Sequence, residues 1–202
     1  MEKGFVFLDE VIPDAQIDAK YYSDDNFTGA NVDGYNVNRV VGTSEMALAL
    51  VKASFQAQHQ GLGLLFWDGY RPIRAVQRFM EWDILPDDGK TKQAHYPNVS
   101  KPQMVALGYI SQKSGHSRGS TIDLSLYKLS TGDLLDMGSC FDFMDISSHH
   151  NAKGISHAAT ENRLLLQSIM IKSGFVPYEN EWWHYTLKDE PYPTTYFDFV
   201  IQ

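Results

Sequence analysis

The sequence predicts an α+β fold, in which helices flank a mainly antiparallel sheet. Segments with helical and with strand patterning alternate irregularly, and the last two strand-like segments, 175–178 and 182–187, lie close together along the chain. No repeat and no linker rich in proline or serine divides the 202 residues. We therefore expect a single domain that spans residues 1–202.

The first seventy residues predict one long helix and one buried strand. The first forty are rich in turn-forming Asp, Asn and Gly, which favours loops and short strands. Thr43 is then typical of a helix N-cap, and Gly61 is typical of the residue that ends a helix. Apolar residues recur between them at three- and four-residue steps: Met46, Leu50, Ala53 and Ala57. The short apolar run 63–67 indicates a buried strand.

Two more helices are predicted before residue 110. Pro72 suits the first position of a helix, where its missing N–H costs nothing. This helix has an apolar stripe of Val76, Phe79 and Met80. Arg71 would then lie at the junction between the 63–67 strand and the helix. After a polar loop at 85–92, Ser100 predicts the N-cap of a short helix that runs to about residue 107.

The second half of the chain predicts a strand, a long helix and two final strands. Alternation over 121–127 gives one apolar face, so Asp123 should project away from the apolar layer. Residues 130–133 suit a hairpin turn. A helix is expected over about 158–173, with these residues facing inward: Leu164, Leu165, Ile169 and Met170. The tail, 189–202, should pack as extended chain.

Composition excludes several classes of function. Hydrophobic residues make up 43% of the chain and aromatic residues 13%, which is incompatible with a disordered protein. The net charge of −8 provides no basic field, so we expect neither nucleic acid nor a membrane surface as a partner. The apolar run near the N-terminus is too short for a signal peptide, and the single Cys140 forms no internal disulfide. We expect a cytoplasmic location.

Two short segments carry the chemistry: Ser114–Asp123 and Glu181–His184. His116, Asp123 and His184 together offer two imidazoles and one carboxylate, a donor set that suits zinc. A zinc ion with three protein ligands keeps a fourth position for water, as catalytic sites do. Glu181, three residues before His184, is the candidate general base that takes the proton of that water.

The position of Glu181 sets a requirement on the fold. Side chains alternate along a strand, so Glu181 and His184, an odd number of residues apart, should face opposite ways on a regular strand. Glu181 must therefore lie at an irregular start of the strand 182–187 if it is to approach the metal. The other histidines are interpreted as ordinary polar residues.

The pattern Ser-x-His-x-x-Gly-x-x-x-Asp at 114–123, with Glu-x-x-His at 181–184, resembles the zinc D,D-peptidase family that includes the VanX-type D-alanyl-D-alanine dipeptidases. The resemblance runs from end to end and includes Trp67-Asp-Gly-Tyr-Arg-Pro72, Phe141-Asp-Phe-Met-Asp145 and Glu181-Trp-Trp-His-Tyr185. Two positions depart from the pattern. Gly115 stands where the family often has Ser, and Thr121 where it usually has Ala.

The resemblance implies a fold of the hedgehog and D,D-peptidase type and one Zn²⁺ per chain. It also implies that His116, Asp123 and His184 bind the metal and that Glu181 is the general base. Arg71 would stabilise the negative oxygen of the transition state, although without the resemblance a surface ion pair is the better interpretation of this residue. Related proteins suggest a homodimer. The implied reaction is hydrolysis of D-Ala-D-Ala to two D-alanines, which depletes a cell-wall precursor as in vancomycin resistance.

A dipeptide substrate needs a group for each of its ends. Ser114 is the candidate for its carboxylate and Asp142 for its ammonium, and the family pattern agrees for Asp142. Tyr21, Tyr35 and Phe79 are candidate walls of a small pocket. Turn capping by Asp142 and core packing of the aromatic residues are the alternatives.

Other functions remain open on the sequence alone. The first is a D,D- or L,D-carboxypeptidase that trims longer wall peptides, which would need an open cleft and normally export. The second is a non-catalytic, zinc-bearing binding module, against which the presence of both Glu181 and Arg71 argues. A role in recovering D-alanine for nutrition would use the same chemistry as resistance.

Overall fold

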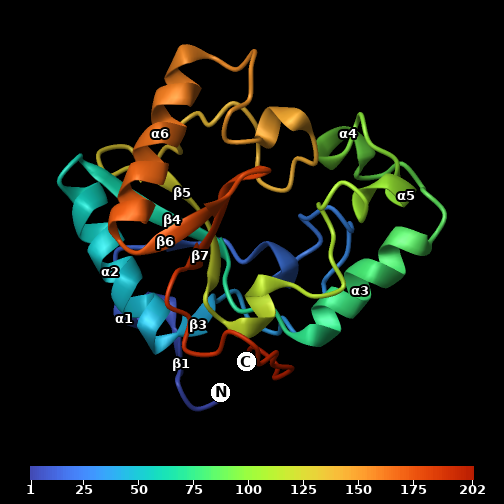
Figure 1. Ribbon diagram of the computed structural model, residues 1–202, viewed down its shortest axis with the longest axis horizontal. Coiled ribbons are helices and arrows are strands. Elements are labelled where there is room, and N and C mark those ends of the chain that lie inside the picture. The colour runs from blue at the N-terminus through green and yellow to red at the C-terminus, as the bar shows by residue number, and fades with distance from the viewer.

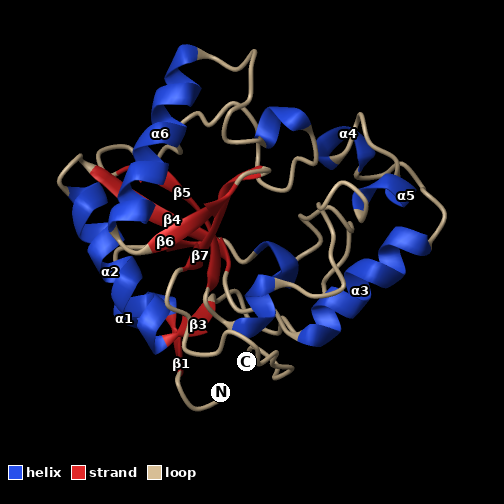
Figure 2. Cartoon of the chain, in the orientation of Figure 1, coloured by secondary structure: helices blue, strands red, loops and turns tan.

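The computed structural model describes residues 1–202 and contains a five-stranded central sheet with helices around it (Figures 1 and 2). The strand order is β2-β4-β5-β7-β6; only the β2–β4 pair is parallel. These strands are β2 (Gln16–Ile17), β4 (Leu62–Asp68), β5 (Thr121–Lys128), β6 (Phe175–Tyr178) and β7 (Glu181–Leu187). A separate small sheet pairs β1 (Phe5–Phe7) with β3 (Val41–Thr43). The predicted α+β fold with a mainly antiparallel sheet is confirmed.

Helices α2 (Ser44–Gln58) and α6 (His157–Lys172) pack together against the sheet (Figure 1). The N-cap of α2 is confirmed, since the Thr43 hydroxyl accepts a hydrogen bond from the Met46 N–H at 3.3 Å. The predicted apolar positions of α2 are buried: Met46, Leu50, Ala53 and Ala57. This helix therefore closes one side of the core, as its three- and four-residue pattern predicted.

The remaining helices lie mostly on the opposite side of the molecule, where α3, α4 and α5 gather (Figure 2). They are α1 (Leu8–Val11), α3 (Ile73–Ile84), α4 (Lys92–His95) and α5 (Lys101–Met104), with 3₁₀ turns η1 (Lys20–Tyr22), η2 (Gly115–Arg118) and η3 (Ile146–Ser148). Pro72 was predicted to be the first residue of this helix. It is instead the N-cap of α3, and the helix begins at Ile73, because the Pro72 backbone is extended at ψ 149°. None of the helices has both the length and the apolar character of a membrane span.

The capped helix at Ser100 forms as predicted but is shorter. Ser100 and Gln103 form a capping box at the start of α5. The helix ends at Met104 instead of continuing to residue 107, since the chain turns back and the Tyr109 N–H donates to the Met104 carbonyl at 3.0 Å. Gly108, at φ +82°, supplies the left-handed conformation in this turn. The segment 108–114 is thereby directed toward η2.

The predicted inner face of α6 is partly wrong. Leu164 is 54% exposed, whereas Leu166, Ile169 and Met170 are buried. Three consecutive leucines leave the phase of the helix ambiguous in the sequence. The buried Arg163 sets the phase instead, because its guanidinium donates to the carbonyls of Ser147 (2.9 Å) and His149 (2.8 Å) and also to that of Met137.

The tail packs as extended chain beneath η2, as predicted. The Phe197 N–H donates to the Ser117 carbonyl at 2.9 Å, and the Phe197 carbonyl accepts from the Ile73 N–H at 3.1 Å. The Phe199 ring stacks on Tyr70 with centroids 4.0 Å apart. The C-terminal segment therefore fixes both η2 and the start of α3, two segments that flank the site described below.

Arg163 provides a test of how the loop 137–149 is held. Replacing it with Met leaves three carbonyl acceptors, one buried and two partly buried, without their donor, so we expect Arg163→Met to lower the free energy of unfolding by about 3 kcal/mol in urea denaturation. Arg78, whose surface ion pair with Glu81 spans 3.6 Å, is the matched control, and Arg78→Met should change stability by less than about 0.5 kcal/mol. Equal effects of the two substitutions would contradict this account of Arg163.

Candidate active site

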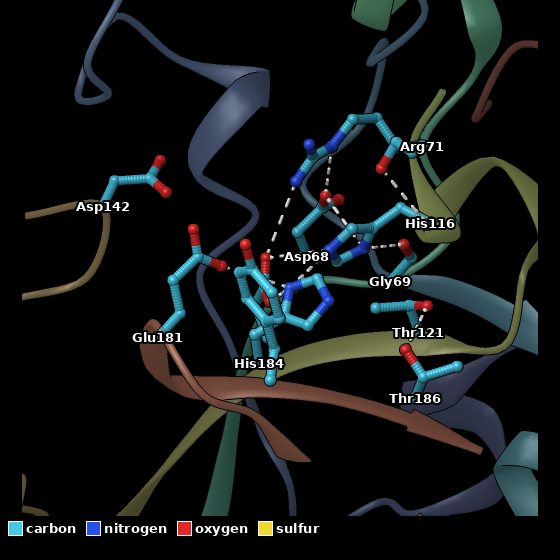
Figure 3. Close-up of polar contacts among 12 residues, drawn as sticks. Asp68, Gly69, Arg71, His116, Thr121, Asp142, Glu181, His184 and Thr186 are labelled. Carbon is cyan, nitrogen blue, oxygen red and sulfur yellow. Dashed lines mark hydrogen bonds and ion pairs between the residues drawn. The ribbon is translucent and has the colours of Figure 1, made fainter. Parts of the chain in front are cut away.

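Three neighbouring strands bring Asp68, Asp123 and His184 into one row. In the antiparallel register Asp68 pairs with Asp123, and Asp123 pairs with His184. Directly paired residues project from the same face of a sheet. The row therefore lies opposite the apolar side chains of β5, as predicted for Asp123, and Figure 3 shows the Asp68 and His184 side chains next to His116. This arrangement depends on β4, β5 and β7 being adjacent.

His116 completes a group of three potential metal ligands. Its Nε2 lies 3.2 Å from Asp123 Oδ2 and 3.3 Å from His184 Nδ1, and His184 Nδ1 lies 3.1 Å from Asp123 Oδ1. One ligand atom from each residue falls within 4.8 Å of the others. The structure thus brings together the three ligands that the sequence predicted, on η2, β5 and β7.

The turn between η2 and β5 directs His116 toward this group. Gly119 ends η2 in the left-handed conformation, at φ +81°, and a Cβ there would clash with the Phe5 ring, so only glycine fits. His116 Nδ1 lies 2.7 Å from the Gly69 carbonyl, to which it donates its proton. The lone pair of Nε2 is then available to a metal, the usual arrangement for a ligating histidine.

The charge distribution of this group favours a cation. Asp123 is 2% exposed, and its Oδ1 atom has no hydrogen-bond partner. Burial opposes ionisation of Asp123, but His116 and His184 outweigh it and hold the pKa of this carboxyl below its usual range. Burial likewise opposes charge on His184, yet Asp123 raises the pKa of this imidazole above its ordinary value. A buried carboxylate facing two imidazole nitrogens fits a divalent metal such as zinc.

Glu181 reaches this group because β7 begins irregularly. Tyr178 pairs with Glu181, whereas the preceding Pro177 pairs with Tyr185, so residues 182–184 form a bulge relative to β6. The bulge brings Glu181 Oε2 to 3.4 Å from His184 Nδ1 (Figure 3). The structure meets the requirement set by the sequence. Burial raises the pKa of Glu181 to about 7, which suits a group that takes up a proton and later releases it.

Arg71 is held in place by Asp68. This residue was not among those predicted for the site from the sequence. Arg71 Nε donates to Asp68 Oδ2 at 2.8 Å, and its Nη2 lies 3.6 Å from Asp123 Oδ2. The Tyr35 hydroxyl donates to the other Asp68 oxygen at 2.7 Å. Tyr35 therefore lies behind Arg71 and does not line the cavity, contrary to its proposed role as a wall. A carboxylate three residues before Arg71 in the quoted motif was the available signal for Asp68.

A cavity of about 240 Å³ opens in front of these residues. Its lining includes the following residues predicted for the site: Tyr21, Arg71, Phe79, Ser114, His116, Asp123, Asp142, Glu181 and His184. Ligand pockets in proteins are commonly about 300–1,000 Å³, so this volume suits a small ligand. Tyr21 and Phe79 form part of the wall, and the Arg71 guanidinium lies 5.1 Å from the centre of each ring.

Asp142 enters the cavity from a strained turn. It is the one non-glycine residue with positive φ, at 53°. Asp tolerates this conformation better than most residues, and such strain is often found at functional sites. The buried Tyr21 hydroxyl donates to Asp142 Oδ2 at 2.8 Å. Burial, together with the charge of Asp123, raises the pKa of Asp142 well above its ordinary value, so a cationic partner would stabilise its ionised form.

Comparison with known proteins identifies the family. The Peptidase_M15 family model, described as D-ala-D-ala dipeptidase, matches residues 1–202. The chain belongs to this family. A protein of Enterococcus faecium named D-alanyl-D-alanine dipeptidase is 57% identical over 202 residues, and a protein of Streptomyces coelicolor with the same name is 52% identical over 201 residues. In both comparisons 100% of each chain is covered.

Solved structures resemble this dipeptidase-family chain less closely. A mutant of the D,D-pentapeptidase VanY from a VanB-type resistance cassette, in complex with Zn(II), gives a TM-score of 0.45 at 18% identity and covers 75% of each chain. The LD-carboxypeptidase LdcB also gives a TM-score of 0.45, at 20% identity, over 75% of this chain and 61% of its own.

The two departures from the dipeptidase family pattern are in contact. A Cβ at Gly115 would lie 2.8 Å from Thr121 Oγ1, which is closer than side chains pack. Thr121 Oγ1 also lies 2.9 Å from Thr186 Oγ1, so a hydrogen bond links β5 to β7 next to the row (Figure 3). Threonine at 121 therefore leaves little room for a side chain at 115. The two departures form one coupled change, and Gly115 does not leave the loop unsupported.

This contact predicts non-additive stability changes. Gly115→Ser forces Thr121 to move, and we expect it to lower the free energy of unfolding by about 1–3 kcal/mol. Thr121→Ala removes one hydrogen bond, which costs about 1 kcal/mol. The double variant should be more stable than the sum of the two changes predicts, by at least about 0.5 kcal/mol in a urea double-mutant cycle. Additive changes would show that the two positions are independent.

Proposed function

We propose that residues 1–202 form one zinc D,D-dipeptidase domain, which binds one zinc ion and hydrolyses D-Ala-D-Ala to two D-alanines. The convergence of His116, Asp123 and His184 beside Glu181, in a cavity of about 240 Å³, carries this proposal. Membership of the D-ala-D-ala dipeptidase family supports the choice of substrate. The names of relatives at 52–57% identity support it as well.

The residues of the site have separate roles in hydrolysis. A zinc ion held by His116, Asp123 and His184 would lower the pKa of bound water to about 7 and polarise the scissile carbonyl. Glu181 accepts the proton of the attacking water and later donates it to the leaving amine. Arg71 remains charged at any relevant pH, and its fork of donors faces the oxygen that becomes negative. Asp68 and Tyr35 hold Arg71 in that orientation.

The ends of a free dipeptide match the remaining polar groups of the cavity. Asp142 binds the substrate ammonium, which compensates the buried carboxylate. The Ser114 oxygen accepts a hydrogen bond from the His116 N–H at 3.3 Å, so its proton is free to be donated to the substrate carboxylate. Tyr21 and Phe79 bound the space for the small side chains. Binding both ends of a dipeptide favours it over longer peptides.

The biological role follows from the substrate. Free D-Ala-D-Ala is the dipeptide that cell-wall precursor synthesis consumes, so its hydrolysis in the cytoplasm would deplete the target of vancomycin. Recovery of D-alanine for nutrition needs the same reaction, and neighbouring genes distinguish the two roles. The homodimer suggested by the resemblance stays a prediction.

The substrate and the metal are tested together. The purified zinc-loaded protein should release D-alanine from D-Ala-D-Ala but not from L-Ala-L-Ala or a wall pentapeptide, as measured by chromatography. Chelation should abolish this activity and added zinc should restore it, because the ligands themselves supply no Lewis acid. Release from the pentapeptide would instead indicate a carboxypeptidase. Bound zinc without cleavage of any substrate would indicate a binding module.

Glu181→Gln tests the proposed base. The amide keeps the shape of the side chain but accepts no proton, so we expect kcat to fall by about 10²–10⁴-fold. Zinc content, measured by atomic absorption, should stay near one per chain, since Glu181 is not a proposed ligand. Glu161→Gln on the exposed part of α6 is the control and should keep full activity. Undiminished hydrolysis by the Glu181 variant would exclude Glu181 as the base.

A further inference from the structure

The cavity contains an excess of carboxylates over free cations. Asp123, Asp142 and Glu181 line it on the acidic side, and Arg71 and Lys113 are its arginine and lysine residues. The Arg71 guanidinium is already engaged by the buried Asp68 at 2.8 Å. Its other contact, Asp123 at 3.6 Å, also lies on the side of the metal ligands. Arg71 is therefore committed to the reacting centre, and so would be the positive charge of a zinc ion held by His116, Asp123 and His184.

A zwitterionic dipeptide brings a negative charge as well as a positive one into this cavity. Its ammonium pairs with Asp142 in the proposed function. Its carboxylate, however, enters a space that already holds three acidic residues. The Ser114 hydroxyl supplies one neutral hydrogen bond and no charge. A hydrogen bond to a carboxylate is stronger when its donor is a cation. In a partly enclosed cavity, nearby carboxylates also repel the carboxylate of the substrate. The substrate carboxylate thus needs a cation at its own end of the dipeptide, in addition to Arg71 and the proposed zinc ion, which both serve the scissile bond.

Lys113 is the cation that the cavity leaves unpaired. The salt bridges formed by lysines involve Lys20, Lys90 and Lys92, so the ammonium of Lys113 forms none. Its backbone is nevertheless fixed, because its N–H donates to Ser111 Oγ at 3.3 Å and its carbonyl accepts from the same hydroxyl at 3.0 Å. Lys113 thus combines a backbone held in a turn, a place in the cavity lining and an ammonium without a salt bridge, which suits an incoming anion.

The position of Lys113 in the chain strengthens this interpretation. It directly precedes Ser114, the N-cap of η2, and both residues line the cavity. Asp142 comes from a different segment, the loop 137–149, where Tyr21 holds it. The carboxylate partners and the ammonium partner are thus supplied by separate parts of the chain. Such a separation suits a ligand with opposite charges at its two ends.

We propose that the Lys113 ammonium binds the C-terminal carboxylate of the substrate and makes the site selective for peptides with a free carboxylate. This inference rests on the proposed function and adds the charged partner of the carboxylate end. Lys113 supplies the charge and Ser114 the directed hydrogen bond. Arg71 remains free to face the scissile carbonyl, so binding and catalysis use different cations.

The test compares two ligands that differ only at this end. Calorimetry with the zinc-loaded, hydrolysis-deficient Glu181→Gln protein gives dissociation constants for D-Ala-D-Ala and for its neutral C-terminal amide. Adding Lys113→Gln should weaken binding of the acid by about two- to fivefold, the range of an exposed ion pair, and leave binding of the amide unchanged. Lys113→Arg should restore most of the preference for the acid.

Lys153→Gln is the matched control, because Lys153 is also exposed and lies in a turn away from the cavity. It should leave both dissociation constants unchanged. Equal weakening of both ligands by Lys113→Gln, or no weakening of either, overturns the proposed contact. Failure of the wild-type protein to hydrolyse D-Ala-D-Ala, with the charge-dependent binding intact, rejects the proposed function alone. If neither the acid nor the amide binds, both the proposed contact and the proposed function are overturned.

Discussion

The register of the three central strands is the constraint on which the site depends. It places Asp68, Asp123 and His184 in one row on one face of the sheet. A slip of one residue in β5 or β7 would turn the affected side chain to the opposite face, against the apolar core. Large buried side chains on that core face, such as Ile122 and Leu124, therefore fix the positions of the ligands. The packing that fixes the register of the core therefore also positions the residues of the site.

The four carboxylates of the site lie in different surroundings, and these surroundings set their roles. Asp68 is paired with Arg71 and serves to position it. Asp123 faces two imidazoles, which keep it ionised and thus suited to bind a metal. Glu181 and Asp142 have raised pKa values because burial dominates. Carboxylates whose environments separate their pKa values are suited to distinct tasks in one reaction.

The sequence predicted most of the fold because its signals were local. The Thr43 cap, the Ser100 cap and the strand at 121–127 depend on neighbouring residues, and all three are present in the structure. The inner face of α6 was wrong at Leu164, since three successive leucines fit more than one phase. Only the carbonyls of the distant loop 137–149, which Arg163 contacts, decide between those phases.

The sequence already shows which groups are available to the site: two histidines and an aspartate as candidate ligands, a nearby glutamate, and an arginine after a buried strand. Residue types and short spacings are enough for that. The tertiary structure alone decided that Glu181 crosses to the metal side through a bulge, and that Tyr35 and Asp68 stand behind Arg71. Those placements depend on pairing between strands far apart in the chain, and no local pattern encodes such pairing.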